Sequence, residues 1–299
     1  MASNQLAFIG LGNMGRGSLA HPLIIYNRTQ SRATEFAKTM TQPVILVPTV
    51  QEAVNRSNMI FMCLGDDIAV ESTIQAALET DVTGKLFVDC STIHPDTTRR
   101  QVLLLESRGA SFVACPVFGA PPVADAGQLV CVLAGRKQAV EQAKPYFAGV
   151  MGRANIDLSQ KNEDPGAAST LKVLGNTLVV QMVTAVSESM VVAEKTGLGV
   201  DVFHDLLEHI FPGFYVSYSN RMKSGEYYQR EEPLFAVDLA RKDARHAMDI
   251  AKGVGARMKG VERADEYLQA VKAHSGEKGD IAGIYGVARQ EAGMKFENQ

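Results

Sequence analysis

Residues 6–15 read LAFIGLGNMG, in which the apolar run Leu6–Ile9 is followed directly by glycines in the spacing G-x-G-x-x-G. The apolar run predicts a buried strand, and the glycines predict a tight turn that leads into a helix. The first glycine of such a turn permits the bend, the second lets backbone N–H groups approach a pyrophosphate, and the third allows close helix–strand packing. We therefore expect a dinucleotide to contact Gly10, Gly12, Asn13, Met14 and Gly15.

Outward from this turn, the first half of the chain alternates between short apolar runs and amphipathic segments. Strand, helix, strand repeated in this way predicts an open parallel sheet with helices on both faces. The predicted strands are 6–9, 23–26, 44–47, 59–64, 86–88 and 112–117, and the predicted helices are 31–40, 68–78 and 96–108.

The second half of the chain has a different pattern. From about residue 165 long helical periodicity replaces the alternation, with 167–196 as the longest segment and no convincing strand. The polar, helix-breaking stretch 163–166 is typical of a domain junction. The sequence thus predicts an α/β protein: a Rossmann-type doubly wound parallel sheet in residues 1–162 and an all-α domain in residues 163–299.

The composition excludes several classes of protein. The chain has 299 residues, of which 46% are hydrophobic and 21% charged, so it can bury a large core. A net charge of -3 without a long block of either sign gives no support for binding to nucleic acid or to an anionic membrane. We expect a small-molecule substrate, no nucleic acid and no membrane, because no apolar stretch approaches about 20 residues. A cytoplasmic location is expected, because the first apolar run lies too close to Met1 for a signal peptide.

Cysteine and histidine patterns predict no metal site. The spacing of Cys63, Cys90, Cys115 and Cys131 matches neither a zinc pattern nor a small disulfide-rich domain, so we expect reduced, buried thiols. The six histidines show no His-Glu-x-x-His arrangement. Gly-x-Ser-x-Gly is also absent, which removes the support for a serine hydrolase.

The residues after the second predicted strand bear on cofactor choice. Enzymes that use NAD usually have an acidic residue here, which accepts hydrogen bonds from the ribose 2′-hydroxyl. This chain has Asn27, Arg28 and Thr29 instead, and an arginine suits a 2′-phosphate. We therefore predict NADPH (NADP+) rather than NADH, with all three residues in the cofactor site.

The segment between the glycine turn and the second strand is unusually short. Residues 16–22 leave little room for a crossover helix, and Gly17 and Pro22 disfavour one. The helix is either reduced to about one turn or shortened by about two turns relative to related proteins. Since its N-terminus would seat the pyrophosphate, we predict weaker cofactor binding than the glycine motif implies.

A second chemical element lies on the long predicted helix. Lys172 and Asn176 are four residues apart, so they project from one helix face. A partly desolvated lysine can exchange a proton with a substrate oxygen, and an amide one turn away can hold the lysine or the substrate. On spacing alone, however, this pattern more often indicates an exposed lysine beside a polar neighbour than a catalytic lysine.

Five separated segments have the order and approximate spacing of the β-hydroxyacid dehydrogenase family, which the chain resembles over almost its whole length. They are 10–15, 89–92, 116–120 with Gly127, Lys172 with Asn176, and 242–243. This 6-phosphogluconate dehydrogenase-like family includes 3-hydroxyisobutyrate dehydrogenases and glyoxylate/succinic semialdehyde reductases. The resemblance implies an NADP-dependent oxidoreductase that transfers a hydride between nicotinamide and a small or medium hydroxy acid, semialdehyde or related carbonyl compound.

The resemblance also implies roles for individual residues. Lys172 is the expected general acid/base and Asn176 its helper, while Leu64, Gly65, Thr92 and Lys242 are expected beside the cofactor. The implied substrate contacts are Ser91, Thr92, Phe118, Gly119, Ala120, Lys172 and Asn176. Relatives pair through the helical domain, so a homodimer is expected.

Phe118 departs from the family pattern. Relatives usually have Ser-Gly-Gly after Pro-Val, whereas this chain has Phe118-Gly119-Ala120. Losing one hydrogen bond to a charged group costs about 1.5 to 3 kcal/mol, or about ten- to a hundred-fold in binding. A small acid should therefore bind less well, and a bulkier carbonyl compound or an imine becomes a candidate substrate.

Two alternative functions remain open. Imine reductases resemble this architecture but generally lack a lysine at the position of Lys172, whose presence favours carbonyl chemistry. The short segment 16–22 also admits a catalytically weak nucleotide-binding interaction protein.

Overall fold

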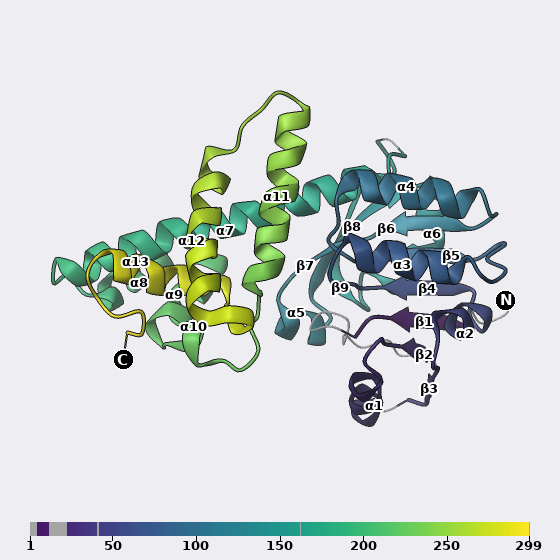
Figure 1. The fold of residues 1–299 in the computed structure, drawn as a ribbon, viewed down its shortest axis with the longest axis horizontal. Coiled ribbons are helices and arrows are strands. Elements are labelled where there is room, and N and C mark those ends of the chain that lie inside the picture. Colours follow the sequence, from purple (N-terminus) through teal and green to yellow (C-terminus); the bar gives the residue numbers. More distant parts are fainter. Residues whose placement is uncertain (1–4, 12–22, 41, 162, 299) are drawn as a thin grey trace. The chain divides into compact units, whose positions relative to one another are not determined.

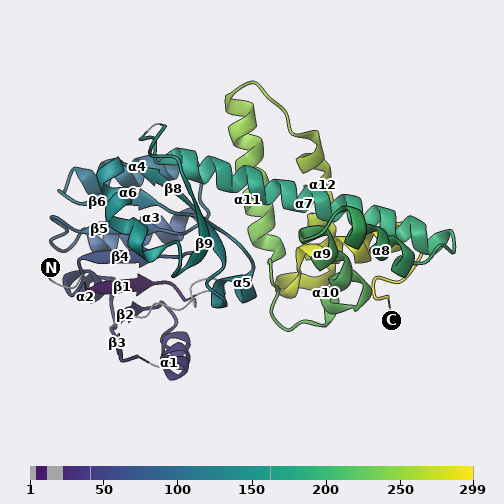
Figure 2. The ribbon, with the colours of Figure 1, turned by 180° about the vertical axis from the view of Figure 1, so that it is seen from behind.

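The computed structural model describes residues 5–11, 23–40, 42–161 and 163–298. The chain divides into two compact units, Met1–Lys172 and Val173–Gln299. In the described residues, a nine-stranded sheet with helices makes up the first unit, and the second unit has helices without a strand (Figures 1 and 2). The predicted fold class, a Rossmann-type sheet followed by an all-α part, is confirmed. The expected boundary between residues 162 and 163 stays a prediction.

The sheet has the strand order β3-β2-β1-β4-β5-β6-β8-β7, and β9 pairs with β8. All neighbours from β3 to β6 are parallel, whereas β8 runs antiparallel to both β6 and β7. The parallel strands are β1 (Leu6–Ile9), β2 (Leu23–Tyr26), β3 (Val44–Leu46), β4 (Met59–Met62), β5 (Leu86–Asp89) and β6 (Ser111–Ala114). The remaining strands are β7 (Val117–Phe118), β8 (Leu129–Gly135) and β9 (Gly152–Asp157). The order reverses at β1, and ligands of open α/β sheets bind at such a point.

Helices cover both faces of the sheet, as the continuous apolar runs predict. Every residue of β1, β4 and β5 is buried, which is typical of central parallel strands. One hydrophobic cluster joins the sheet to α1 (Gln30–Thr39) and α6 (Lys137–Ala143). The other cluster joins it to α2 (Val50–Asn55), α3 (Asp67–Ala77), α4 (Pro95–Glu106) and the start of α7.

Several short elements differ from the sequence expectations. The predicted strand 112–117 is two strands, β6 and β7, because Pro116 between them cannot donate a ladder hydrogen bond. Strands β8 and β9 and the short helices α2, α6 and α5 (Pro121–Asp125) were not predicted. The short helices span too few turns to show a clear helical period. The sheet is therefore parallel from β3 to β6, as predicted, and antiparallel at the β6–β8–β7 edge, which was not predicted.

The second unit is built on α7 (Gly166–Lys195), which begins in the first unit. Gly197, with a φ of 78°, lies two residues after the end of this helix, in a conformation that favours glycine. The other helices are α8 (Val200–Ile210), α9 (Phe214–Lys223), α10 (Glu226–Gln229), α11 (Val237–Gly253), α12 (Lys259–Ser275) and α13 (Ile284–Glu291). Short 3₁₀ turns lie at Lys144–Tyr146, Gly276–Lys278 and Ile281–Gly283. A hydrophobic core drawn from these helices buries Val183, Met190 and Tyr285.

Helix α7 is long and apolar enough to cross a membrane, judged by length and composition alone. Polar residues interrupt the apolar run of this helix, so the sequence shows no continuous apolar stretch there. Of the most apolar window of α7, 56% is buried within the protein, as in the core helix of a folded domain. Such a helix is weak support for a membrane span, and none is assigned.

Candidate cofactor and catalytic site

Gly10 stands at the carboxyl end of β1, where the strand order reverses. Its φ is 94°, and a Cβ there would lie 2.5 Å from the Cys63 carbonyl oxygen and 2.7 Å from Leu64 Cδ2. Only glycine fits this close approach without strain. The Gly10 N–H donates to the Tyr26 carbonyl at 3.1 Å, which ties the turn to β2. The rest of the predicted motif, Gly12, Asn13, Met14 and Gly15, and the short segment 16–22 lie outside the described residues.

The residues after β2 support the same turn. Asn27 Oδ1 accepts the Leu11 N–H at 2.9 Å, and Asn27 Nδ2 donates to the Thr29 carbonyl at 2.7 Å. Arg28 is exposed beside them at the end of the strand. The structure thus gives Asn27 a role in shaping the turn and leaves the Arg28 side chain at the surface.

Loops after β4 and β5 meet at the same edge of the sheet. The Leu64 N–H donates to Ser91 Oγ at 2.8 Å, and the Ser91 N–H donates to Asp89 Oδ1 at 3.0 Å. Ser91 is only 3% exposed. Gly65 is exposed and Thr92 is partly exposed beside these contacts. Ser91 therefore holds the two loops together, and Gly65 and Thr92 keep solvent-accessible surface beside it.

The four cysteines are free thiols, and three of them are buried; Cys63 is partly exposed. Cys63, Cys90 and Cys115 each follow a parallel strand, β4, β5 and β6, at this edge. Desolvation of the sulfur atoms raises the pKa of the Cys63 and Cys115 thiols, and a hydrogen bond with Cys115 lowers the pKa of Cys131. Buried thiols of raised pKa are poor nucleophiles and metal ligands. Among the described residues, no group of three or more metal-ligating side chains is brought together.

Lys172 and Phe118 meet in the first unit. The Lys172 ammonium nitrogen lies 4.4 Å from the centroid of the Phe118 ring, a cation–π contact, and Lys172 is only 8% exposed. Phe118 ends β7, and Gly119 beside it has a φ of 147° and no room for a Cβ, which would lie 2.6 Å from Leu129 Cδ2. The charge of Lys172 also acts on the Cys63 thiol, just after β4. The ammonium therefore lies at the carboxyl edge of the sheet.

In the second unit, Asn176 and Lys242 both contact Asp243. Asn176 Nδ2 donates to Asp243 Oδ2 at 2.7 Å, and Lys242 Nζ lies 2.9 Å from Asp243 Oδ1. Asn176 and Lys242 are each 8% exposed, and Asp243 is 2% exposed. Asp243 belongs to the family-like segment 242–243, but no role was predicted for it from the sequence. Its carboxylate orients the Asn176 amide and neutralises the Lys242 ammonium.

Most of the described site candidates of the first unit gather at one edge. At or beside the carboxyl ends of β1, β4, β5 and β7 lie the following candidates: Gly10, Leu64, Gly65, Ser91, Thr92, Phe118 and Lys172. An edge with a close backbone approach at Gly10 suits a dinucleotide, and a buried ammonium can transfer a proton to a ligand oxygen. Asn176 and Lys242 belong to the second unit.

Comparisons with known proteins agree with this geometry. Residues 5–158 match the family model of the NAD binding domain of 6-phosphogluconate dehydrogenase. Residues 166–288 match the family model of the NAD-binding domain of NADP-dependent 3-hydroxyisobutyrate dehydrogenase. The NADH-dependent oxidoreductase ucdB of Aspergillus ustus is 36% identical over 281 residues, which are 94% of each protein.

Solved structures share the fold. The 3-hydroxyisobutyrate dehydrogenase of Mycobacterium tuberculosis with L-serine has a TM-score of 0.79 at 24% identity, over 96% of this chain and 99% of that one. An imine reductase from Streptomyces aurantiacus has a TM-score of 0.63 at 18% identity, over 95% and 99%. Both the matched family models and the shared fold fit the motifs in the sequence. The chain belongs to the β-hydroxyacid dehydrogenase family and is an NAD(P)-dependent oxidoreductase.

Proposed function

We propose that this oxidoreductase is NADP(H)-dependent and interconverts a hydroxy acid, semialdehyde or related carbonyl compound, with Lys172 as general acid/base. The buried Lys172 ammonium at the carboxyl edge of the sheet is the observation that supports this most strongly. Gly10, which favours close backbone approach to a pyrophosphate, lies at the same edge. A proton donor and a dinucleotide seat on one edge are the two parts that carbonyl reduction needs.

The proposed cofactor contacts fit a nicotinamide dinucleotide. Gly10 and the predicted motif residues Gly12 to Gly15 would hold the pyrophosphate, with Leu64, Gly65, Thr92 and Lys242 beside the rest of the cofactor. The exposed Arg28 after β2 favours NADPH, because a guanidinium binds a 2′-phosphate well. The relative from Aspergillus ustus is named NADH-dependent, so direct titration of both cofactors is the test of this preference.

In the proposed reaction the bound nicotinamide supplies or accepts the hydride. The Lys172 ammonium stabilises negative charge that develops on the carbonyl oxygen and donates a proton to it; the neutral amine takes that proton back in oxidation. The Phe118 ring holds the ammonium in place, at about 0.5 to 2 kcal/mol for such a contact. The Asn176 amide, oriented by Asp243, helps to hold the substrate.

Phe118 narrows the proposed substrate class. Its ring presents an apolar surface beside Lys172, at a position where the family resemblance implies a serine. A carboxylate gains less there than it would from a hydroxyl, so we propose a less polar carbonyl compound. Ser91, Thr92, Gly119 and Ala120 are proposed as further substrate contacts.

The reaction class is tested by oxidation of NADPH and of NADH against semialdehydes, 2-keto acids, bulky ketones and cyclic imines. We expect turnover with carbonyl compounds and preference for NADPH. Turnover of a cyclic imine with no carbonyl compound would favour imine reduction, which the apolar Phe118 wall permits. Cofactor binding with no turnover in the whole panel would favour an interaction protein and contradict the proposal.

We also propose a homodimer formed through the helical unit. Val202, Leu206 and Ile210 are 52%, 43% and 57% exposed and recur every fourth residue along α8. An apolar stripe of this kind on a surface helix is typical of a protein interface. Light scattering should report a dimer, and Leu206→Lys should give monomers. A monomeric wild-type protein would contradict this.

A cytoplasmic location is proposed from the four free cysteines, since thiols stay reduced in that compartment. Cell fractionation tests it, and recovery with a secreted fraction would contradict it.

A further inference from the structure

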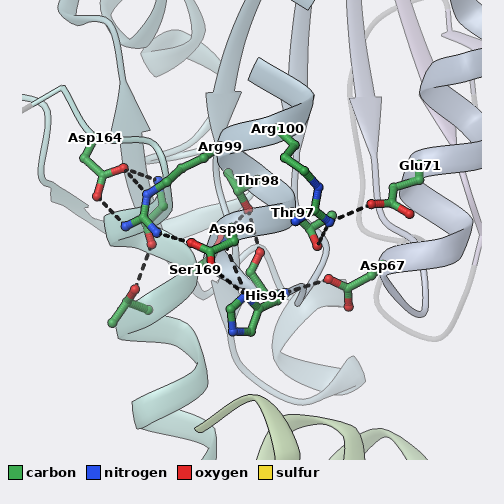
Figure 3. Close-up of polar contacts among 12 residues, drawn as sticks. Asp67, Glu71, His94, Asp96, Thr97, Thr98, Arg99, Arg100, Asp164 and Ser169 are labelled. Carbon is green, nitrogen blue, oxygen red and sulfur yellow. Dashed lines mark hydrogen bonds and ion pairs between the residues drawn. The ribbon is translucent and has the colours of Figure 1, made fainter. Parts of the chain in front are cut away.

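Helix α7 carries Lys172, and its first turns pack against α4 (Figure 3). Lys172 stands about 9 Å along the axis from Gly166, at about 1.5 Å per residue. Side-chain ends lie about 5 to 6 Å from a helix axis, so a rotation of about 10° moves the ammonium by about 1 Å. A misplacement of about 1 Å can slow a reaction by about a hundred-fold. Whatever fixes the rotation of α7 therefore fixes the proton donor.

A buried hydroxyl pair provides one directional contact. The Thr98 and Ser169 oxygens are 2.7 Å apart, and these residues are 1% and 2% exposed. Ser169 precedes Lys172 by three residues, so the two lie on neighbouring parts of one helix face. Ala168 beside it is fully buried, but a methyl group packs without a preferred direction. The hydroxyl pair is the more specific restraint on helix rotation, because hydrogen bonds are directional.

A bidentate ion pair holds the start of the helix. Arg99 Nε and Nη2 donate to Asp164 Oδ1 and Oδ2 at 3.0 and 2.8 Å, and Nη1 donates to Asp96 Oδ1 at 2.6 Å. Asp164 Oδ1 also accepts the Gly166 N–H at 3.0 Å. A Cβ at Gly166 would lie 2.8 Å from Arg99 Cζ, so glycine lets the guanidinium cover the helix start. The fork geometry fixes an angle as well as a distance.

Helix α4 is in turn tied to α3, which follows the loop at Leu64 and Gly65. The His94 N–H donates to Asp67 Oδ1 at 2.9 Å, and Arg100 Nη2 donates to Glu71 Oε1 at 2.8 Å (Figure 3). The helix that restrains α7 is thus anchored beside the proposed cofactor edge. Through α4, the position of Lys172 is therefore fixed relative to that edge of the sheet.

We propose that the α4–α7 clamp, made of Thr98, Arg99, Asp164 and Ser169, positions the Lys172 ammonium for proton transfer. The inference rests on the proposed function, in which Lys172 is the general acid/base. These are positioning residues, since they act through α7. The contact of the ammonium with the Phe118 ring, at 4.4 Å, gives an independent marker of where the ammonium lies.

The kinetic test compares Ser169→Ala with Ser187→Ala. Ser187 lies on the same helix, is 0% exposed, and its Oγ contacts Met222 Sδ at 3.9 Å in the second unit. With the best substrate of the carbonyl panel, Ser169→Ala should lower kcat about tenfold or more and leave the cofactor KM unchanged. Ser187→Ala should keep the wild-type kcat.

Variants of the partner residue show whether the pair acts as a unit. Thr98→Val should lower kcat like Ser169→Ala, whereas Thr98→Ser, which keeps the hydroxyl, should restore it. The Thr98→Val/Ser169→Ala double variant should be no slower than the slower single variant. Additive losses in kcat would overturn the pairing.

A spectroscopic test needs no substrate. In protein labelled with ¹³C at lysine Cε, the Phe118 ring should shift the Lys172 resonance upfield; Lys172→Ala identifies the signal. Ser169→Ala should reduce this ring-current shift, and Ser187→Ala should leave it unchanged. An unchanged shift in Ser169→Ala, or a kcat equal to that of Ser187→Ala, would overturn the clamp. Full activity of Lys172→Ala would instead overturn the proposed function and leave the spectroscopic result standing.

Discussion

Two buried lysines in this molecule are held in different ways. Lys172, in the first unit, lies over the Phe118 ring, whereas Lys242, in the second, lies 2.9 Å from the Asp243 carboxylate; each is 8% exposed. A carboxylate neutralises an ammonium at short range, while an aromatic face attracts it more weakly. In the proposed reaction Lys172 transfers the proton, whereas Lys242 is proposed to contact the cofactor.

The largest expected effect on stability comes from removing the Asp243 carboxylate. Asp243→Ala removes the carboxylate that lies 2.9 Å from the buried Lys242 ammonium, which costs about 3 to 5 kcal/mol of unfolding free energy. Urea denaturation measures it. Asp201→Ala is the control, because this aspartate is 80% exposed and should leave stability close to wild type. Equal stability of the two variants would show that the buried pair is not what holds Lys242.

Gly10 tests whether the sheet edge is a cofactor seat. Gly10→Ala adds a Cβ at 2.5 Å from a carbonyl oxygen in a left-handed conformation, so cofactor affinity should fall about tenfold or more. Gly84→Ala is the matched control, because Gly84 has a φ of 72° with nothing within 4 Å. Both variants carry the backbone strain, of about 1 to 2 kcal/mol, and only Gly10→Ala carries the clash. Calorimetric titration of NADPH separates them, and equal affinities would remove Gly10 from the seat.

Substitutions of Phe118 test how the ring beside Lys172 affects the choice of substrate. Phe118→Ser restores a hydroxyl, so kcat/KM for a 2-keto acid should rise about tenfold relative to a bulky ketone. Phe118→Leu is the control, since it removes the ring without adding a donor. A rise of equal size in both variants would show that ring size, and not the missing hydroxyl, excludes the acid.

The smallest effect is the pH dependence of the ion pair at the start of α7. Hydrogen bonds from Arg99 lower the pKa of Asp164 in the folded protein. The stabilisation is therefore fully present above the unfolded value of about 3.9 and is lost as pH falls through the lower folded pKa. The difference in urea midpoint between wild type and Asp164→Asn should be constant from pH 7 to about 5 and shrink below about 4. A difference that shrinks near neutral pH would contradict this assignment.

Much of the fold could be predicted from the sequence because it depends on patterns among neighbouring residues. The apolar runs of β1, β4 and β5 and the helical periodicity of α7 follow directly from residue order. The antiparallel edge did not, because the pairing of β8 with β6 and β7 is a long-range choice that alternation alone does not reveal.

The sequence identified the residues of the candidate site, but it did not predict the contacts between their side chains. The glycine motif and the resemblance singled out Gly10, Phe118, Lys172 and Asn176, but nothing local indicates that the Phe118 ring lies beside the Lys172 ammonium. The same holds for Arg99 and Asp164, which look like ordinary surface charges until α4 and α7 pack together. Asp243 directly follows Lys242 in the sequence, and this adjacency could have indicated that its carboxylate pairs with the Lys242 ammonium.

The most direct test of the account is single-turnover hydride transfer in Lys172→Ala and Lys242→Ala, with the most rapidly reduced compound of the carbonyl panel. Lys172→Ala should slow transfer by about a hundred-fold or more and leave NADPH affinity within about twofold. Lys242→Ala should weaken NADPH binding and leave the rate at saturating cofactor near wild type. Hydride transfer at the wild-type rate in Lys172→Ala would contradict the central claim that this ammonium is the proton donor.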